Sequence, residues 1–147
     1  MNLVLRSAGP GDADAVAGVW LRSFPAALPT VRRAHTDDEV RAWLADAVAH
    51  GATWVAEVDG EVVGMLVIAG RSVSQLYLDP SWRGHGIGDR LVELAKRERP
   101  DGLELWTFQV NGPARRFYGR NGFVEVELTD GATNEEHEPD VRLVWKP

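Results

Sequence analysis

The sequence predicts a mixed α/β fold with a mostly antiparallel sheet, and three observations support that class. The chain of 147 residues has the length of one domain. Apolar residues recur with the two-residue period of strands in some segments and with helical spacing in others. Asp59-Gly60 separates two apolar runs, which is a strong signal for an antiparallel hairpin. The predicted order is β-α-α-β-β-β-α-β-α-β-β, with about seven strands and about four helices.

The first strand and the first helix are expected near the N-terminus. Leu3 to Arg6 alternates apolar and polar residues, as a half-buried strand does. Asp12 or Asp14 can cap the helix that follows, because a carboxylate accepts hydrogen bonds from the free N–H groups of a first turn. The apolar residues of this helix recur at helical spacing: Val16, Val19, Trp20 and Phe24.

A stiff connector over residues 24–36 and a second helix come next. Pro25 and Pro29 are expected to end the first helix, because proline lacks the N–H that a helix interior uses. Thr36 and Glu39 have the spacing of a capping box, in which each side chain accepts a hydrogen bond from the other residue's backbone N–H. The second helix is expected to bury five apolar residues: Val40, Trp43, Leu44, Ala47 and Val48.

The middle of the chain predicts an antiparallel meander followed by a crossover. Residues 53–58, 61–69 and 73–78 read as three strands with short turns between them. A helix over residues 86–99 leads to a strand over 103–108. Because a helix joins the strands 73–78 and 103–108, they are expected to lie parallel.

The C-terminal part predicts a short helix and the last two strands. The helix is expected from Ala114 to Arg120, with Asn121-Gly122 ending it in a left-handed turn. The strands are expected over residues 123–128 and 141–145, with a long acidic loop between them.

Composition excludes several classes of function. The net charge is -6 and the isoelectric point about 5.2, which argues against nucleic acid or an anionic membrane as the main partner. The chain has no cysteine, so it has no disulfide and no thiol nucleophile. The four histidines show no metal-ligand spacing, and no metal is expected. No apolar run suits a signal peptide or a membrane span, so a cytoplasmic protein is expected.

A glycine-rich loop follows the strand 73–78 and opens the helix 86–99. It reads Arg83-Gly84-His85-Gly86-Ile87-Gly88. The first N–H groups of a helix lack intrahelical partners and lie at the positive end of its dipole, so such a loop binds phosphate. The Rossmann pattern fails because Asp89 stands where its last glycine is required, and a Walker loop fails because no Lys-Ser/Thr pair follows. A nucleotide-binding protein is therefore a minor alternative.

Two motifs together resemble those of the GNAT superfamily of N-acyltransferases. The first is the R-x-x-G-x-G loop after a strand that ends in Asp79-Pro80. The second is Asn111-x-x-Ala114-x-x-Phe117-Tyr118 followed by Gly122-Phe123. The resemblance covers nearly the whole chain and implies a single GNAT domain over residues 1–147, with central strands that splay apart. It implies transfer of the acetyl group of acetyl-CoA directly to a primary amine, and homodimers are common in proteins of this kind.

The resemblance also implies roles for individual residues. Backbone N–H groups of the loop, with the Arg83 side chain, would hold the diphosphate of coenzyme A. The strand 75–78 would pair with the pantetheine arm as an added strand, and the N–H of Leu76 or its neighbour would stabilise the oxyanion. Tyr118 would protonate the departing thiolate. The expected cofactor-binding residues are Gln75, Leu76, Tyr77, Leu78, Arg83, Gly84, His85, Gly86, Ile87, Gly88, Asn111, Arg115 and Tyr118.

Structural roles compete with some of these assignments. Tyr118 can be an amphipathic core residue, and Asn111 can cap the helix that begins at Gly112. Both roles can hold for Asn111. The remaining large aromatic residues are expected in the core: Trp20, Trp43, Trp54, Trp106, Phe117, Phe123 and Trp145.

The acceptor and the general base stay open at this stage. No carboxylate lies on the strand 73–78, and four glutamates elsewhere are the main candidates for the base: Glu57, Glu104, Glu135 and Glu136. Glu138 and His137 are further candidates. The resemblance implies that the acidic loop 129–140 and the connector 24–36 flank the acceptor site. The loop suits a cationic amine, whereas Arg32 and Arg33 of the connector suit a carboxylate. Amino acids, polyamines, aminoglycosides and peptide N-termini all fit. The alternative to an enzyme is a non-catalytic acyl-CoA-binding sensor or regulatory domain.

Overall fold

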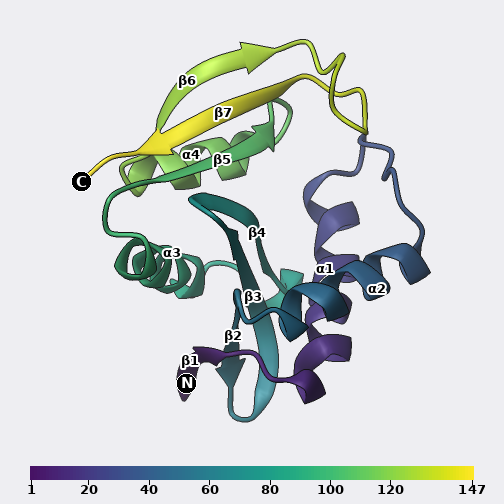
Figure 1. The fold of residues 1–147 in the computed structure, drawn as a ribbon, viewed down its shortest axis with the longest axis vertical. Helices are drawn as coiled ribbons and strands as arrows, with labels where there is room; N and C mark the ends of the chain where they lie inside the picture. Colours follow the sequence, from purple (N-terminus) through teal and green to yellow (C-terminus); the bar gives the residue numbers. More distant parts are fainter.

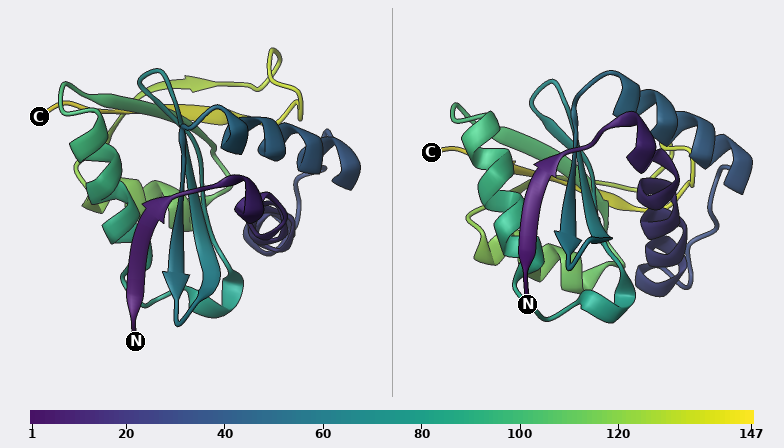
Figure 2. Two further views of the ribbon diagram at one scale, coloured as in Figure 1. Left: turned by 60° about the horizontal axis from the view of Figure 1, so that its bottom comes forward. Right: turned by 90° about the horizontal axis from the view of Figure 1, so that it is seen from below.

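Seven strands form one sheet, and four α-helices cover its faces in the computed structural model of residues 1–147 (Figures 1 and 2). In chain order the elements are β1 Leu3–Ser7, α1 Ala13–Ala27, α2 Asp37–Ala49, β2 Thr53–Val58, β3 Glu61–Ala69, β4 Ser72–Leu78, α3 Ile87–Glu98, β5 Leu103–Phe108, α4 Gly112–Arg120, β6 Val124–Thr129 and β7 Asp140–Trp145. Short 3₁₀ turns occupy Pro10–Asp12 and Pro80–Trp82. The predicted fold class and element order are confirmed.

The sheet has the strand order β1-β2-β3-β4-β5-β7-β6, and every neighbouring pair is antiparallel except β4 and β5. β4 and β5 run parallel but share one paired position, Ser72 with Glu104. The Glu104 N–H donates to the Arg71 carbonyl at 3.0 Å, and no further pairing follows. The strands therefore meet at one end and separate beyond it, so the predicted splay is confirmed.

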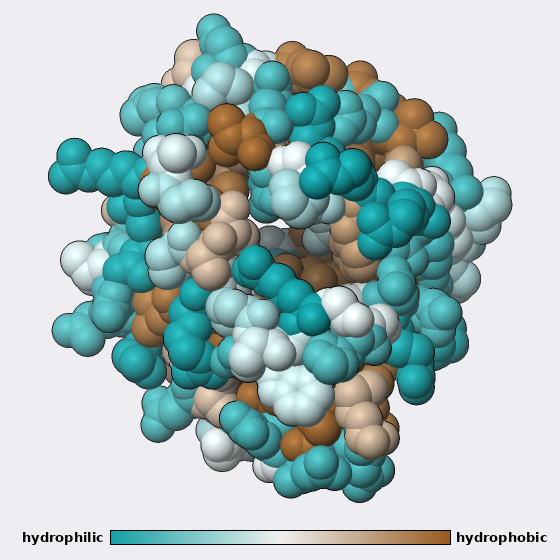
Figure 3. Space-filling model, turned by 180° about the vertical axis from the view of Figure 1, so that it is seen from behind, coloured by the Kyte–Doolittle hydropathy of each residue, from teal (hydrophilic) through white to brown (hydrophobic).

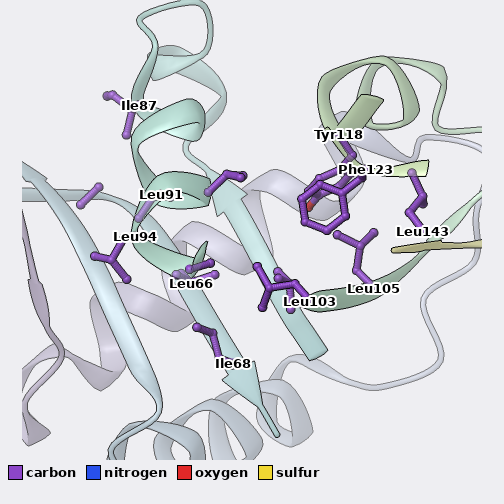
Figure 4. Packing of buried hydrophobic residues seen from close by; sticks show 14 of the residues in the cluster. Leu66, Ile68, Ile87, Leu91, Leu94, Leu103, Leu105, Tyr118, Phe123 and Leu143 are labelled. Carbon is purple, nitrogen blue, oxygen red and sulfur yellow. The ribbon is translucent and has the colours of Figure 1, made fainter. Parts of the chain in front are cut away.

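Two apolar clusters hold the helices on the sheet. One joins α1 and α2 to β2 and β3 and includes Val55, Met65 and Val67. The other lies under α3 and α4 and contains residues from both halves of the splayed sheet, as Figure 4 shows: Leu66, Ile68, Leu91, Leu103, Leu105 and Leu143. Because this second cluster joins β3 to β5 and β7, it fixes the two halves relative to each other where β4 and β5 no longer pair.

Helix α1 ends later than was predicted from the positions of Pro25 and Pro29. It continues through Pro25 to Ala27 and stops at Leu28, whose N–H donates to the Phe24 carbonyl at 2.8 Å. Pro25 lies in the last turn, where its missing N–H removes a single helical hydrogen bond. Leu28 precedes Pro29 and is therefore disfavoured from the helical region; its φ of -131° and ψ of 61° agree.

The predicted cap of α1 is wrong in its contacts, whereas that of α2 is confirmed. Asp12 occupies the N-cap position of α1, but its carboxylate accepts from the Gly9 N–H at 2.8 Å and pairs with Arg6 at 2.7 Å. An ion pair to the neighbouring strand thus competes with the helix for this carboxylate. Thr36 and Glu39 form the reciprocal capping box of α2, with hydrogen bonds of 2.9 and 3.2 Å.

Two tryptophans that were expected in the core are exposed. Trp43 is 41% exposed because α2 buries the stripe of Val40, Leu44 and Val48, and Trp43 lies beside that stripe. Trp106 is 45% exposed because it faces away from its neighbour Leu105, which is buried under the helices. The other aromatic residues pack in or against the clusters, as expected: Trp20, Trp54, Phe117, Phe123 and Trp145.

Candidate active site

The glycine loop lies between β4 and α3 with its backbone open to solvent. Gly84 and Gly86 have φ values of 81° and 76°, in the left-handed region that glycine adopts without strain. Gly86 is the N-cap of α3, and no side chain caps the first turn. The first N–H groups of α3 are therefore free to bind an anion at the positive end of its dipole.

Glycine is required at the three loop positions for two different structural reasons. A Cβ on Gly84 or Gly86 would meet no protein atom within 4 Å, so only their backbone conformation and a ligand constrain them. A Cβ on Gly88 would lie 3.1 Å from two ring atoms of Phe117. Gly88 therefore allows α3 and α4 to pack closely, which is a structural role.

The other loop side chains lie at the surface. Arg83 and His85 are exposed, and Arg83 makes no hydrogen bond or ion pair with the protein. The His85 ring lies 5.2 Å from the half-buried Trp82 ring. Arg83 is thus free to contact a phosphate held by the loop.

Helix α1 fixes the strand that faces the splay. The Trp20 indole N–H donates to the Gln75 side-chain oxygen at 2.9 Å, and the Ser23 hydroxyl donates to the Leu78 carbonyl at 2.6 Å. The Arg22 guanidinium lies 2.7 Å from the Asp79 carboxylate. Trp20 was expected in the core, but these contacts with β4 and Asp79 were not predicted; the one available signal was a serine on an otherwise apolar helix face. Beyond Ser72, the β4 edge toward β5 has no strand partner and is open to an added strand.

Tyr118 extends from α4 into the space beside the splay (Figure 4). The residue is 8% exposed and packs edge-on against the Phe117 and Phe123 rings, at 5.1 and 5.5 Å. Its hydroxyl has no hydrogen-bond partner in the protein. The only enclosed side-chain oxygen or nitrogen without a partner is Thr53 Oγ1, so the Tyr118 hydroxyl reaches accessible space. Burial, and then the nearby Tyr77, raise the pKa of Tyr118 above its usual value, so it is a proton donor at neutral pH.

Asn111 and Arg115 make contacts within the protein. Asn111 Oδ1 accepts from the Ala114 N–H at 3.1 Å, so the capping role is confirmed. Arg115 donates twice to the Glu125 carboxylate, at 2.8 Å each, and to the Gln109 carbonyl at 3.1 Å. These bonds use three of the five N–H donors of the guanidinium.

The two segments predicted to flank the acceptor site, the acidic loop 129–140 and the connector 24–36, touch each other. Figure 1 shows the β6–β7 loop meeting the α1–α2 connector, and there His35 Nε2 contacts the Glu135 carboxylate. Figure 3 shows a hollow in the middle of the opposite face of the molecule, with apolar side chains on its floor. An open cavity of about 520 Å³ lies along the connector and is lined by Phe24, Pro25, Leu28, Pro29, Val31, Arg33 and His35.

Three of the four candidate bases are paired. Glu57 lies 2.9 Å from Arg6, Glu104 lies 3.0 Å from Arg142, and Glu135 contacts His35. Glu136 is half-buried and pairs with no cation. Glu138 is likewise half-buried and makes no ion pair, so the carboxylates of Glu136 and Glu138 are both free.

Comparisons with known proteins agree with this architecture. The family model described as an acetyltransferase (GNAT) domain matches residues 49–125. The peptidyl-lysine N-acetyltransferase YjaB of Salmonella typhimurium is 31% identical over 124 residues, which cover 84% of each chain. The peptidyl-lysine N-acetyltransferase YiaC of Escherichia coli is 27% identical over 125 residues, which cover 84% of this chain and 85% of that one.

Solved structures share the fold over the full length. The solution structure of apo YjaB from Escherichia coli superposes with a TM-score of 0.81 at 23% identity, over 99% of this chain and 98% of that one. The PaiA N-acetyltransferase from Thermoplasma acidophilum, in complex with coenzyme A, gives 0.73 at 19% identity over all of both chains.

The splayed sheet, the open loop at α3 and the buried phenol beside the splay define an acyltransferase of the acyl-CoA-dependent type. The chain belongs to the GNAT acetyltransferase family. It is an enzyme, and acetyl-CoA is its cosubstrate. None of its helices combines the length and the apolarity that a membrane crossing requires.

Proposed function

We propose that the acceptor is a cationic primary amine with no carboxylate beside it, and specifically the side-chain amine of a lysine within a peptide. The observation that carries this proposal is the charge balance of the acceptor walls. In the connector, Arg33 donates to Asp37 and to the His35 carbonyl, and His35 contacts Glu135. Both cations that line the cavity are therefore neutralised by groups of the protein.

The remaining charges favour a cation. Glu136 and Glu138 are half-buried, and their carboxylates make no ion pair. Arg32 is exposed, so solvent screens its charge more than it screens the charges of the half-buried glutamates. A zwitterionic amino acid would bring its own carboxylate near these glutamates, and like charges at short range repel. A lysine inside a peptide has no such carboxylate, and the relatives YjaB and YiaC are named peptidyl-lysine N-acetyltransferases.

We propose the following roles for the site residues. The loop Arg83–Gly88 binds the diphosphate through its N–H groups, and the open β4 edge over Gln75–Leu78 binds the pantetheine arm. The thioester then lies in the splay, where a backbone N–H of β4 can stabilise the oxyanion. Tyr118 donates a proton to the departing thiolate. These roles are supported by the free N–H groups, by the missing strand partner and by the unbonded phenol.

The acceptor is tested by following CoA release with matched amines. The panel contains a peptide with one internal lysine and blocked termini, the same peptide with arginine in place of lysine, free lysine, and spermidine. We expect the highest kcat/KM for the lysine peptide and no release with the arginine peptide. A higher kcat/KM for free lysine or for spermidine would contradict the proposed acceptor while leaving acetyl transfer intact.

A further inference from the structure

The cavity along the α1–α2 connector has a mostly apolar lining. Phe24, Leu28 and Val31 line it, and all three are buried. Pro25 and Pro29 also line it and are exposed. Its volume of about 520 Å³ lies within the range of pockets that hold small ligands, about 300–1,000 Å³. The cavity therefore has room for one large side chain.

The two charged residues of the lining already have partners. Arg33 donates to the Asp37 carboxylate and to the His35 carbonyl, and its guanidinium lies 5.9 Å from the centre of the Trp20 ring. His35 contacts the Glu135 carboxylate. An anionic ligand would find no free cation in the lining, and a cationic ligand would lose its hydration against apolar walls. The cavity therefore suits an uncharged, apolar group.

Contacts of the lining residues place the cavity beside the splay. Phe24 stacks on Trp20 with ring centroids 5.0 Å apart, and Trp20 packs edge-on against Tyr77 of β4 at 5.9 Å. The cluster that contains the buried lining residues also packs against Phe108, the last residue of β5. Tyr77 and Phe108 belong to the parts of β4 and β5 that no longer pair. The cavity thus lies next to both separated strands.

The cavity and the glycine loop belong to opposite faces of the sheet. Along β3, Met65 and Val67 belong to the cluster under α1 and α2, whereas Leu66 and Ile68 belong to the cluster under α3. Because successive side chains of a strand point to opposite faces, α1 and α3 cover opposite faces of this part of the sheet. A ligand in the cavity would therefore leave the loop at the start of α3 free for coenzyme A.

We propose that the cavity binds an apolar side chain of the peptide substrate, from a residue within two positions of the acceptor lysine. This inference rests on the proposed function, in which the acceptor is a lysine inside a peptide. An extended peptide advances about 3.3 Å per residue, so such a neighbour lies about 3–7 Å along the chain from the lysine. This distance is comparable with the ring separations of 5.0 and 5.9 Å that lead from the cavity through Trp20 to Tyr77. The cavity thus selects lysines by their neighbours in the peptide.

The test is the acetylation of peptides that differ at one residue. Each peptide has blocked termini and a single lysine, and leucine, alanine, aspartate or arginine occupies one of the positions within two residues of it. We expect leucine at one position to raise kcat/KM by about 10-fold over alanine, because its larger apolar surface is buried. Aspartate and arginine should give no such increase.

The possible outcomes separate this inference from the proposed function. Equal kcat/KM for all the peptides, or the highest value with aspartate or arginine, would overturn the inference and leave the lysine acceptor intact. Release of CoA with none of the peptides would overturn both.

Matched variants of the full-length enzyme locate the selection. Val31→Thr adds a hydroxyl to the cavity wall with little change in size. Val48→Thr makes the same change at a similarly buried position of the same cluster, outside the cavity lining. The preference for leucine over alanine should fall by about three-fold or more in Val31→Thr and stay unchanged in Val48→Thr. The same preference in both variants would place the apolar site elsewhere and overturn the inference.

A single introduced thiol gives a measurement that depends on neither turnover nor a buried substitution. The chain has no cysteine, and Pro29 is an exposed lining residue, so Pro29→Cys carries the only thiol. Arginine replaces lysine in the best leucine peptide and in its alanine counterpart, and acetyl-CoA is present, so no acetyl group is transferred and no CoA thiol is released. The leucine peptide should slow the reaction of the thiol with a maleimide several-fold more than the alanine peptide does. Equal reaction rates with the two peptides would contradict binding in this cavity.

Discussion

Replacing a loop glycine should weaken coenzyme A binding far more than it weakens the fold. Gly86 has a φ of 76° and an open surrounding in which a Cβ meets no protein atom within 4 Å. In Gly86→Ala the folded state therefore bears only the left-handed strain of a non-glycine residue, about 1–2 kcal/mol. For a domain of this size that loss lowers Tm by roughly 3–6 °C.

The same methyl group should weaken the binding of coenzyme A. The Cβ would lie where the diphosphate approaches the free N–H groups of α3, so at least one hydrogen bond to the charged ligand is lost. A hydrogen bond to a charged group contributes about 1.5–3 kcal/mol, which corresponds to roughly 10- to 100-fold weaker binding. Gly84→Ala should act similarly, because Gly84 has a φ of 81° and an equally open surrounding.

Gly60→Ala is the matched control for this experiment. Gly60 has a φ of 84° and no atom within 4 Å of the added Cβ, but it lies in the β2–β3 turn. Thermal unfolding should show a similar loss of Tm in all three variants, and isothermal titration with CoA should show weaker binding in the loop variants alone. Wild-type affinity in Gly84→Ala and Gly86→Ala would refute the assignment of the diphosphate to this loop.

Two further predictions concern a proton donor and an ion pair. Tyr118→Phe should lower kcat by about 10²-fold or more, with little change in KM for acetyl-CoA or in Tm. The fold should be unaffected because the lost hydroxyl makes no hydrogen bond within the protein. Steady-state kinetics and thermal unfolding measure these quantities, and an unchanged kcat would contradict the role of Tyr118 as a proton donor. Asp12→Asn should lower the free energy of unfolding by about 1 kcal/mol at pH 7, since the partly exposed pair with Arg6 is screened. Arg6 lowers the pKa of Asp12 from 3.8 to about 2, so this contribution is present above pH 3.8 and is lost as the pH falls toward 2. Urea unfolding at pH 7 and pH 2 should therefore show a difference between variant and wild type that disappears in acid.

Local signals predicted the features of the fold that depend on a few neighbouring residues. Asp59 and Gly60 both have positive φ, at 51° and 84°, as the turn type read from their sequence requires. The capping box of Thr36 and Glu39 is likewise complete within four residues. The parallel crossover from β4 to β5 was predictable because a connecting helix leaves few topologies open. The open loop at α3 followed from the spacing of its glycines.

Contacts between segments that are far apart in the chain could not be predicted from neighbouring residues. Asp12 was expected to cap α1, but a cation from β1 takes its carboxylate, and the sequence does not show that β1 passes there. Trp106 is an aromatic residue of the kind that usually lies in a core, yet it lies on the face of β5 opposite to the buried Leu105. The contact of His35 with Glu135 joins residues 100 positions apart. It brings a carboxylate to His35 in the region that we propose for the acceptor.

The splay leaves one edge of β4 without a strand partner, and the surrounding structure keeps this edge open. A strand edge without a partner leaves N–H and C=O groups exposed, and proteins normally cover or blunt such edges. Here α1 fixes β4 from one side through Trp20 and Ser23, while the cluster under α3 holds the separated halves from the other. The open edge is thus kept available without collapsing. The free N–H groups of α3 lie at the end of the loop that we propose for the diphosphate. In the proposed arrangement, a thioester bound along the open edge of β4 has its sulfur near Tyr118, which lies beside the splay.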